Sequence, residues 1–375
     1  VQRGGATHAR CACPRCAVAS YQPMSCFPAR SGLLLFSRRA EMHHTVADRQ
    51  SHLPVGLGRA SCSAFFLCGR QAAPESVGAV RRPAIMSLMS TPPPFRLIEP
   101  TGSAGGAVFS SPHSGRAYPS DFVRAARLGA TELRASEDAF IDRLFEAAPD
   151  FGAPLIAATA PRAYVDLNRA PDELDPAVIE GVRATGINPR VAAGLGVIPR
   201  VVAEGAAIYS GKISRGEAAE RLSRFHAPYH EALGGLLRRA RMRNGRALLF
   251  DCHSMPSDAL KSAPRVRGRR PEIVLGDRFG AAAADWAMAM AQAAFEDAGF
   301  AVARNTPFAG GYITQRYGRP GQGVHAVQIE IDRALYLDEA KIEPGPGFDS
   351  LARALRPVIA ALAAARPEER ALAAE

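Results

Sequence analysis

Two histidines in this sequence each follow a short apolar run, and together they could bind a metal ion. His113 lies in the segment Pro112-His-Ser-Gly115, just after Ala107-Val-Phe, and His253 follows Ala247-Leu-Leu-Phe-Asp-Cys. In α/β sheets the functional groups lie on loops just past the strand ends. A single histidine at such a place is usually a structural residue, but two at equivalent strand ends favour a metal site.

A metal site of this kind would need a carboxylate as its third ligand, because two histidines and one carboxylate leave a coordination position for water. Asp138 is well placed in the first turn of a predicted helix, and Asp142 follows one turn later on the same face. Asp138 could instead stabilise the positive end of that helix. Asp251 lies two residues before His253 on the same strand face and could orient its imidazole. Cys252 faces the other way and is expected in the core.

The segment from Val327 to Asp332 alternates between apolar and polar residues, as a strand does. Ile329 would face one side while Gln328 and Glu330 face the other. A carboxylate buried in such a strand is costly unless it is paired or functional. Glu330 is therefore a candidate general base, and an ordinary salt bridge is the alternative.

Arginine and asparagine side chains that could hold an anionic substrate are concentrated in one segment. Arg162, Asn168 and Arg169 lie within eight positions of one another. Because a guanidinium binds a carboxylate through two hydrogen bonds, this segment could hold an acidic substrate. The alternative is an ordinary surface cluster in an arginine-rich chain. His226 and His230 could chelate a metal from one helix, but we expect them to pack.

The elements that must position these residues alternate along the chain. The predicted strands are 107–111, 163–167, 246–252, 300–304 and 327–331, and the predicted helices are 136–145, 217–243, 277–298 and 350–365. The loop 253–256 would follow the third strand. Alternating strands and helices predict an α/β domain with a central mixed, mostly parallel sheet flanked by helices.

The net charge of +10 could suggest a nucleic-acid partner, but it is unevenly distributed. Residues 1–85 contain 11 arginines and 3 acidic residues, a net charge of +8, whereas the remaining residues contain 35 basic and 33 acidic side chains. The nearly neutral body offers no basic stripe, so nucleic-acid binding is not expected. No apolar run approaches the roughly 18 residues needed to cross a bilayer, so we expect no membrane partner.

Residues 1–85 show no sustained helical or strand period. Their arginine- and serine-rich composition superficially fits a transit peptide, and Cys11, Cys13 and Cys16 with His8 could bind a metal. A disordered leader is another interpretation. We favour a non-native or disordered extension, with the true start at Met86 or Met89 and a catalytic domain over 86–375. Only Cys252 lies beyond this extension, which fits a reducing cytoplasm.

Several motifs, taken together and in order, resemble the N-formylglutamate amidohydrolase family. They are Pro112-His-Ser-Gly115 with Tyr118-Pro119, Glu137-Asp138 to Asp142-Arg-Leu, Tyr164-Val-Asp-Leu-Asn-Arg169, Gly196-Val-Ile-Pro199, Asp251-Cys-His-Ser-Met255, Leu275-Gly-Asp277, Asn305-Thr-Pro-Phe with Gly310-Gly-Tyr-Ile-Thr314, and Gln328-Ile-Glu330 with Leu335-Tyr-Leu337. The resemblance runs from about residue 107 to residue 340 without large gaps. It implies a single zinc-peptidase-like (phosphorylase/hydrolase-like) domain, related to the zinc carboxypeptidases and the aspartoacylase group.

The resemblance also implies roles for individual residues. His113 and His253 would bind one Zn²⁺ per chain, although other divalent metals are possible, and Glu330 would be the base. Asn168 and Arg169 would hold the substrate carboxylate. Arg162 would polarise the carbonyl group that is cleaved.

One departure from the related carboxypeptidases concerns the third metal ligand. Those relatives use His-x-x-Glu, whereas Arg116 stands three residues after His113. We therefore choose Asp138 as the carboxylate ligand.

The expected activity is hydrolysis of the amide of an N-acyl amino acid, with N-formyl-L-glutamate as the substrate that the resemblance implies. The partner would then be a small acidic molecule. The alternatives are a related N-acyl amino acid or small-peptide amidohydrolase, or a non-catalytic binding protein on the same fold. The oligomeric state cannot be inferred from the sequence.

Overall fold

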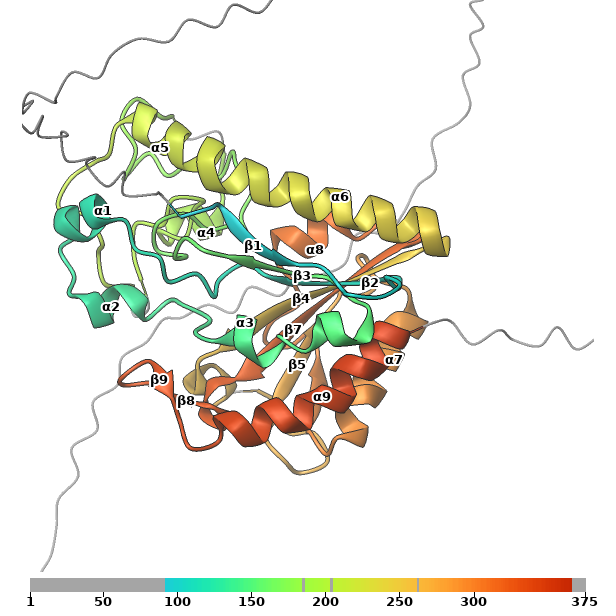
Figure 1. Ribbon diagram of the computed structural model, residues 1–375. Helices are drawn as coiled ribbons and strands as arrows, with labels where there is room; N and C mark the ends of the chain where they lie inside the picture. Colours follow the sequence, from blue (N-terminus) through green and yellow to red (C-terminus); the bar gives the residue numbers. More distant parts are fainter. Residues whose placement is uncertain (1–91, 184–185, 203–204, 262, 366–375) are drawn as a thin grey trace, which may run out of the picture. The chain divides into compact units, whose positions relative to one another are not determined.

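The structure is a computed structural model, and it describes residues 92–183, 186–202, 205–261 and 263–365 (Figure 1). The interpretations offered for residues 1–85 lie outside this part of the chain. No helix within the described ranges is long and apolar enough to cross a membrane.

Seven of the described strands form one sheet, in the order β1-β3-β2-β4-β7-β5-β6. Their bounds are β1 Phe95–Ile98, β2 Ala107–Ser111, β3 Leu155–Ala158, β4 Ala247–Met255, β5 Ile273–Gly276, β6 Val302–Arg304 and β7 Val324–Asp332. Strands β3, β2, β4 and β7 run parallel to one another, and so do β5 and β6. Only β1 against β3 and β5 against β7 are antiparallel pairs of this sheet. The predicted α/β class with a mixed, mostly parallel sheet is confirmed.

Helices cover both faces of the sheet, as Figure 1 shows for α6 on one face and for α7 and α9 on the other. The helices are α1 Ser120–Ala125, α2 Ala130–Arg134, α3 Ile141–Leu144, α4 Pro189–Ala192, α5 Arg215–Arg221, α6 Ala227–Asn244, α7 Asp285–Asp297, α8 Tyr312–Tyr317 and α9 Phe348–Ala364. A turn of π-helix over Leu222–His226 joins α5 to α6. Two short strands, β8 Leu337–Asp338 and β9 Glu343–Pro344, form a separate pair.

The central strands are buried on both faces, so their apolar residues point alternately into two cores. Phe109 and Phe250 belong to the core beneath α7 and α9. Val108 and Leu249 belong to the core beneath α6. Cys252 is fully buried in the first of these cores, as its place in the strand pattern predicts. Continuous apolar runs of this kind are typical of parallel strands covered on both sides.

Several predicted bounds are wrong. The predicted strand 163–167 is a turn, because Tyr164 and Val165 both donate their backbone N–H groups to the carbonyl of Pro161. The predicted loop 253–256 belongs largely to β4, which pairs with β7 residue by residue as far as Met255.

Two predicted helices begin later than expected. The helix predicted over 136–145 is reduced to α3, because Phe140 takes a left-handed backbone conformation with φ of 64° directly before it. The helix predicted over 277–298 begins only at Asp285, since Arg278 and Phe279 also have positive φ values.

The sheet should depend strongly on Phe109 in β2. Its ring is fully buried and lies 5.8 Å from the ring of Phe145 and 5.2 Å from that of Phe250, measured between centroids. We predict that Phe109→Ala lowers the free energy of unfolding by about 3–5 kcal/mol, because it leaves a cavity between these rings. Urea denaturation followed by circular dichroism measures the change.

Val123 provides the control for this substitution, since this residue is 38% exposed. Val123→Ala should change the free energy of unfolding by no more than about 0.5 kcal/mol. A Phe109→Ala protein as stable as the Val123→Ala protein would contradict this account of the core.

Candidate active site

The candidate active site lies where three parallel strands end at the same edge of the sheet. His113 follows β2 by two residues, His253 lies near the end of β4, and Glu330 lies near the end of β7. In the register of β4 and β7, His253 is directly opposite Glu330, and Asp251 is opposite Gln328. Since side chains alternate along a strand, all four of these residues in β4 and β7 point to one face of the sheet.

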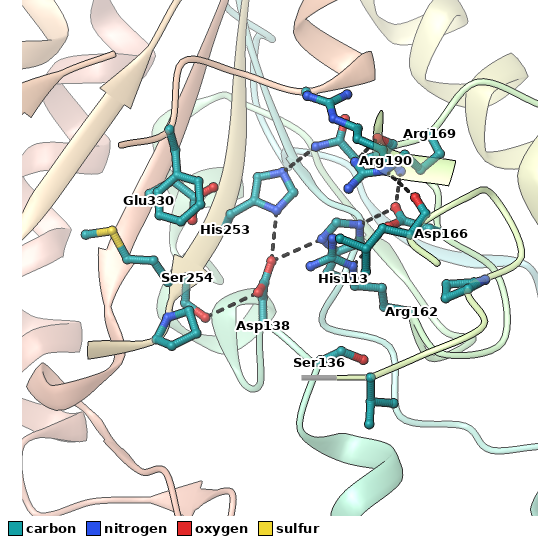
Figure 2. Close-up of a pocket in the computed structure, with 18 of the residues that line it drawn as sticks. His113, Ser136, Asp138, Arg162, Asp166, Arg169, Arg190, His253, Ser254 and Glu330 are labelled. Carbon is teal, nitrogen blue, oxygen red and sulfur yellow. Dashed lines mark hydrogen bonds and ion pairs between the residues drawn. The ribbon is translucent and has the colours of Figure 1, made fainter. Parts of the chain in front are cut away.

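The carboxylate of Asp138 lies between the two histidines and is buried with them. Its Oδ2 is 3.2 Å from Nδ1 of His113 and 2.8 Å from Nδ1 of His253 (Figure 2). Asp138 comes from the loop between α2 and α3, where its backbone N–H donates to the carbonyl of His113. These three side chains offer ligand atoms that all lie within 4.8 Å of one another, so they could hold a metal ion.

The second nitrogen of each histidine faces another buried carboxylate. His113 Nε2 lies 2.7 Å from Asp166 Oδ1, and His253 Nε2 lies 3.0 Å from Asp251 Oδ2. In metal sites a ligating histidine commonly makes such a contact, which fixes its tautomer and ring orientation. Asp251 thus lies where its spacing from His253 predicts.

The electrostatics of this group suit a cation. Burial by itself raises the pKa of Asp138, but hydrogen bonds from His113 and His253 outweigh burial and hold that pKa well below its usual range. Burial lowers the pKa of His253, whereas the charges of Asp251 and Asp138 outweigh it and raise the pKa well above its usual range. Imidazole nitrogens and one carboxylate oxygen are also donors that Zn²⁺ prefers. The residues present therefore fit a zinc ion.

Arg333 supports Asp138 from the opposite side to the histidines. Its Nη2 donates to Asp138 Oδ1 at 3.2 Å and to the carbonyl of Glu137 at 2.6 Å. Its Nε donates to the hydroxyl of Ser254 at 3.1 Å. This arginine is buried, and all the acceptors in contact with it belong to the protein, so it is placed to hold Asp138 in position.

Asp142 does not join the candidate metal group. It is paired with Arg116 at 3.0 Å and with Arg96 at 3.2 Å. Arg116 is the residue that stands three positions after His113, so the side chain found there binds a neighbouring carboxylate and supplies no ligand itself.

Glu330 is buried beside the candidate metal group. Gln328 Nε2 donates to its Oε1 at 2.7 Å, and Gln328 Oε1 in turn accepts a hydrogen bond from the backbone of Gly311 at 2.8 Å. Burial raises the pKa of Glu330 to about 7. No ion pair of Glu330 is found within the described ranges, so the salt-bridge alternative has no support there.

The segment that was expected to hold an acidic substrate lies at the same cavity. Arg162 Nε donates to Asp166 Oδ2 at 3.0 Å. Asn168 Nδ2 lies 3.1 Å from His253 Nε2, and its Oδ1 accepts from the backbone of Ile313 at 2.8 Å. The structure thus brings Arg162 and Asn168 next to the two histidines, as Figure 2 shows for Arg162.

The cavity has a volume of about 700 Å³ and is lined by every predicted site residue except Asp251, which lies beneath His253. Sequence reasoning missed Asp166, Arg190, Gln328 and Arg333. Gln328 could have been found by its spacing of two from Glu330, the same strand alternation that identified Asp251. Asp166 lies outside the strands, so no such alternation points to it.

His226 and His230 do not belong to the candidate metal group. Their Nε2 atoms lie 2.9 Å from the carbonyl oxygens of Arg169 and Leu167, respectively. Burial lowers the pKa of His230 to about 3, so this side chain stays neutral. The two histidines thus contact backbone carbonyls of the Arg162–Arg169 segment, which agrees with the packing role expected of them.

Comparisons with known proteins identify the family. The model of the family "N-formylglutamate amidohydrolase" matches residues 106–337. The chain is 32% identical over 239 residues to an N-formylglutamate deformylase of Pseudomonas putida, covering 62% of this chain and 82% of that protein. It is 33% identical over 257 residues to an N-formylglutamate deformylase of Pseudomonas aeruginosa, covering 67% of this chain and 89% of that protein.

A crystal structure supports the same assignment. The N-formylglutamate amidohydrolase of Ralstonia eutropha JMP134 superposes with a TM-score of 0.68 at 36% identity, covering 72% of this chain and 97% of that one. The resemblance noted in the sequence is therefore confirmed, and so is the expectation of an amidohydrolase that acts on a linear amide. By these matches, the chain belongs to the N-formylglutamate amidohydrolase family.

Proposed function

We propose that this protein uses zinc to hydrolyse N-formyl-L-glutamate to formate and L-glutamate. The observation that carries the proposal is the buried group of His113, Asp138 and His253, with Glu330 facing the same cavity. The names of the relatives from the two Pseudomonas species support the choice of substrate. The cytoplasmic location stays a prediction from composition.

His113, Asp138 and His253 would hold the metal through Nδ1, Oδ2 and Nδ1, the atoms that converge in the structure. Zinc bound there would supply Lewis acidity, which polarises a carbonyl and makes water more acidic. Asp166 and Asp251 would keep both imidazoles oriented, and Arg333 would keep Asp138 in place. The three ligands would thus be fixed before any substrate binds.

Glu330 would move the proton in this reaction. As the water oxygen bonds to the formyl carbon, Glu330 accepts a proton from that water. The carbon–nitrogen bond then breaks, and Glu330 returns the proton to the nitrogen of the leaving glutamate. Arg162 faces the same cavity and would stabilise the negative charge that develops on the formyl oxygen.

Metal removal tests the first half of this proposal. A chelator should abolish formate release, and added Zn²⁺ should restore it.

Substitution of a proposed ligand tests where the zinc binds. His253→Ala should lower the zinc content of the purified protein from about one ion per chain to near zero, because one of three protein ligands is lost. Inductively coupled plasma mass spectrometry measures the zinc.

His325→Asn is the matched control, because His325 is also a buried histidine but lies outside the candidate metal group. This variant should keep its zinc. Formate release that continues at full rate in the metal-free protein would refute the zinc requirement.

Glu330→Gln tests the general base. The amide keeps the shape of the side chain but cannot accept the proton, so we expect kcat for formate release to fall by about 100-fold or more. The zinc content should not change. Glu146→Gln, at an exposed position, is the control and should keep wild-type kcat.

The pH dependence of the rate provides a second test of Glu330. A base works only when deprotonated, so activity should be lost as the pH falls through the pKa of this residue. Burial places that pKa at about 7, and a bound cation would lower it, because a positive charge favours the carboxylate. We therefore expect kcat/KM to rise with pH, with a midpoint at or below about 7. The same rise in Glu330→Gln would show that another group is the base.

A further inference from the structure

Three of the arginines that line the cavity stand together, and their charges are not all balanced by the protein. Arg162 is paired with Asp166 at 3.0 Å. Arg169 and Arg190 line the same cavity, yet neither has a carboxylate within 4.0 Å among the residues that the structure describes. In Figure 2 the three arginines lie on one side of the two histidines and Glu330 on the other. The cavity thus presents two guanidinium groups that form no direct ion pair with the residues described.

Arg169 is the more deeply placed of the two. It is buried, with 8% of its surface exposed, and it donates from Nε to the carbonyl of Leu195 at 2.9 Å and from Nη1 to the carbonyl of Asn168 at 2.8 Å. Burial lowers its pKa; the negative charge of Asp166 opposes this effect, whereas the positive charges of Arg162 and Arg190 add to it. An anion bound here would relieve this crowding of positive charge.

Arg190 and Arg169 are both hydrogen-bonded to the backbone of Leu195. It lies in α4, where the side chain of Asn188 accepts a hydrogen bond from the backbone of Arg190. Leu195 donates its backbone N–H to the carbonyl of Arg190 at 2.8 Å, while its own carbonyl binds Arg169. Arg190 is half-buried, and its guanidinium has no hydrogen-bond partner within the described ranges. Its backbone is fixed and its charged end is available at the cavity.

The two arginines differ in how deeply they are buried, and the two carboxylates of an N-acyl glutamate differ in their distance from the amide. Asn168, the neighbour of Arg169, contacts His253, so Arg169 is near the place where the amide must lie. In an N-acyl amino acid the α-carboxylate is only one carbon from the amide nitrogen, whereas a side-chain carboxylate is farther away. Arg190 is more exposed than Arg169 and is linked to it through Leu195, which leaves it as the arginine for the carboxylate farther from the amide.

We propose that Arg190 binds the side-chain carboxylate of a dianionic N-acyl amino acid, while Arg169 holds its α-carboxylate. This assignment rests on the proposed function and makes Arg190 the residue that selects glutamate over uncharged amino acids of the same shape. A guanidinium facing a carboxylate can form two charge-assisted hydrogen bonds, which the corresponding amide cannot replace.

The test compares N-formylglutamate with N-formylglutamine, which has the same shape but no side-chain charge. For the wild-type protein we expect kcat/KM to favour N-formylglutamate. In Arg190→Gln this preference should fall by about 10- to 100-fold, because a charge-assisted interaction is lost. The loss should lie mainly in KM, since the group is bound equally before and during the reaction.

Arg243→Gln is the matched control. Arg243 is exposed on α6 and does not line the cavity, so its substitution should leave the preference between the two substrates unchanged. A structural role of Arg190 would lower both activities together and leave the preference at its wild-type value. That result, or an Arg190→Gln protein with wild-type activity on both substrates, would overturn the assignment.

A binding measurement separates this inference from the proposed function. Isothermal titration calorimetry of the zinc-loaded full chain with L-glutamate and L-glutamine should show tighter binding of L-glutamate, and Arg190→Gln should remove the difference. If the wild-type protein releases no formate but shows this Arg190-dependent binding, the proposed function fails and the carboxylate site stands. If it releases formate but neither measurement depends on Arg190, the site fails and the function stands.

Discussion

The contact on which the site depends is the buried carboxylate of Asp138 between two imidazole rings. A carboxylate without water must be compensated, because burying an unpaired charge costs several kcal/mol. Here His113, His253 and Arg333 all contact Asp138. His253 and Asp138 alone are 115 residues apart in the chain, so the arrangement forms only when distant segments fold together.

The sheet explains why these segments meet. Strands β2, β4 and β7 are parallel neighbours, so their carboxyl ends lie at one edge, where polar side chains replace the apolar residues covered by α6. Asp251 and His253 continue the face of β4 to which Leu249 belongs, and Glu330 continues the same face in β7. A strand that is apolar for most of its length and polar at its end can therefore serve the core and the cavity together. Arg169 and Arg190 complete the cavity from the loops beside this edge.

Much of this arrangement can be predicted from the sequence, namely those residues whose positions are set by the local alternation of apolar and polar side chains. His113, His253 and Glu330 were found because each follows or ends an apolar strand, and Cys252 was placed in the core by alternation. Asp138 was chosen as a residue of a first helical turn, yet it lies in the loop before α3. Its neighbours in sequence do not fix its position, but its contacts with both histidines do.

Other features depend on contacts that no local pattern reveals. Arg333 reaches Asp138 across 195 residues, and Asp166 reaches His113 across 53. Neither contact can be inferred from the residues next to it in the sequence.

Anomalous diffraction at the zinc edge from crystals of the purified protein tests most directly whether the side chains of His113, Asp138 and His253 bind zinc. We predict one peak per chain, at a zinc ion bound by Nδ1 of His113, Oδ2 of Asp138 and Nδ1 of His253. A zinc-loaded crystal with no peak there, or with its zinc elsewhere, would contradict it.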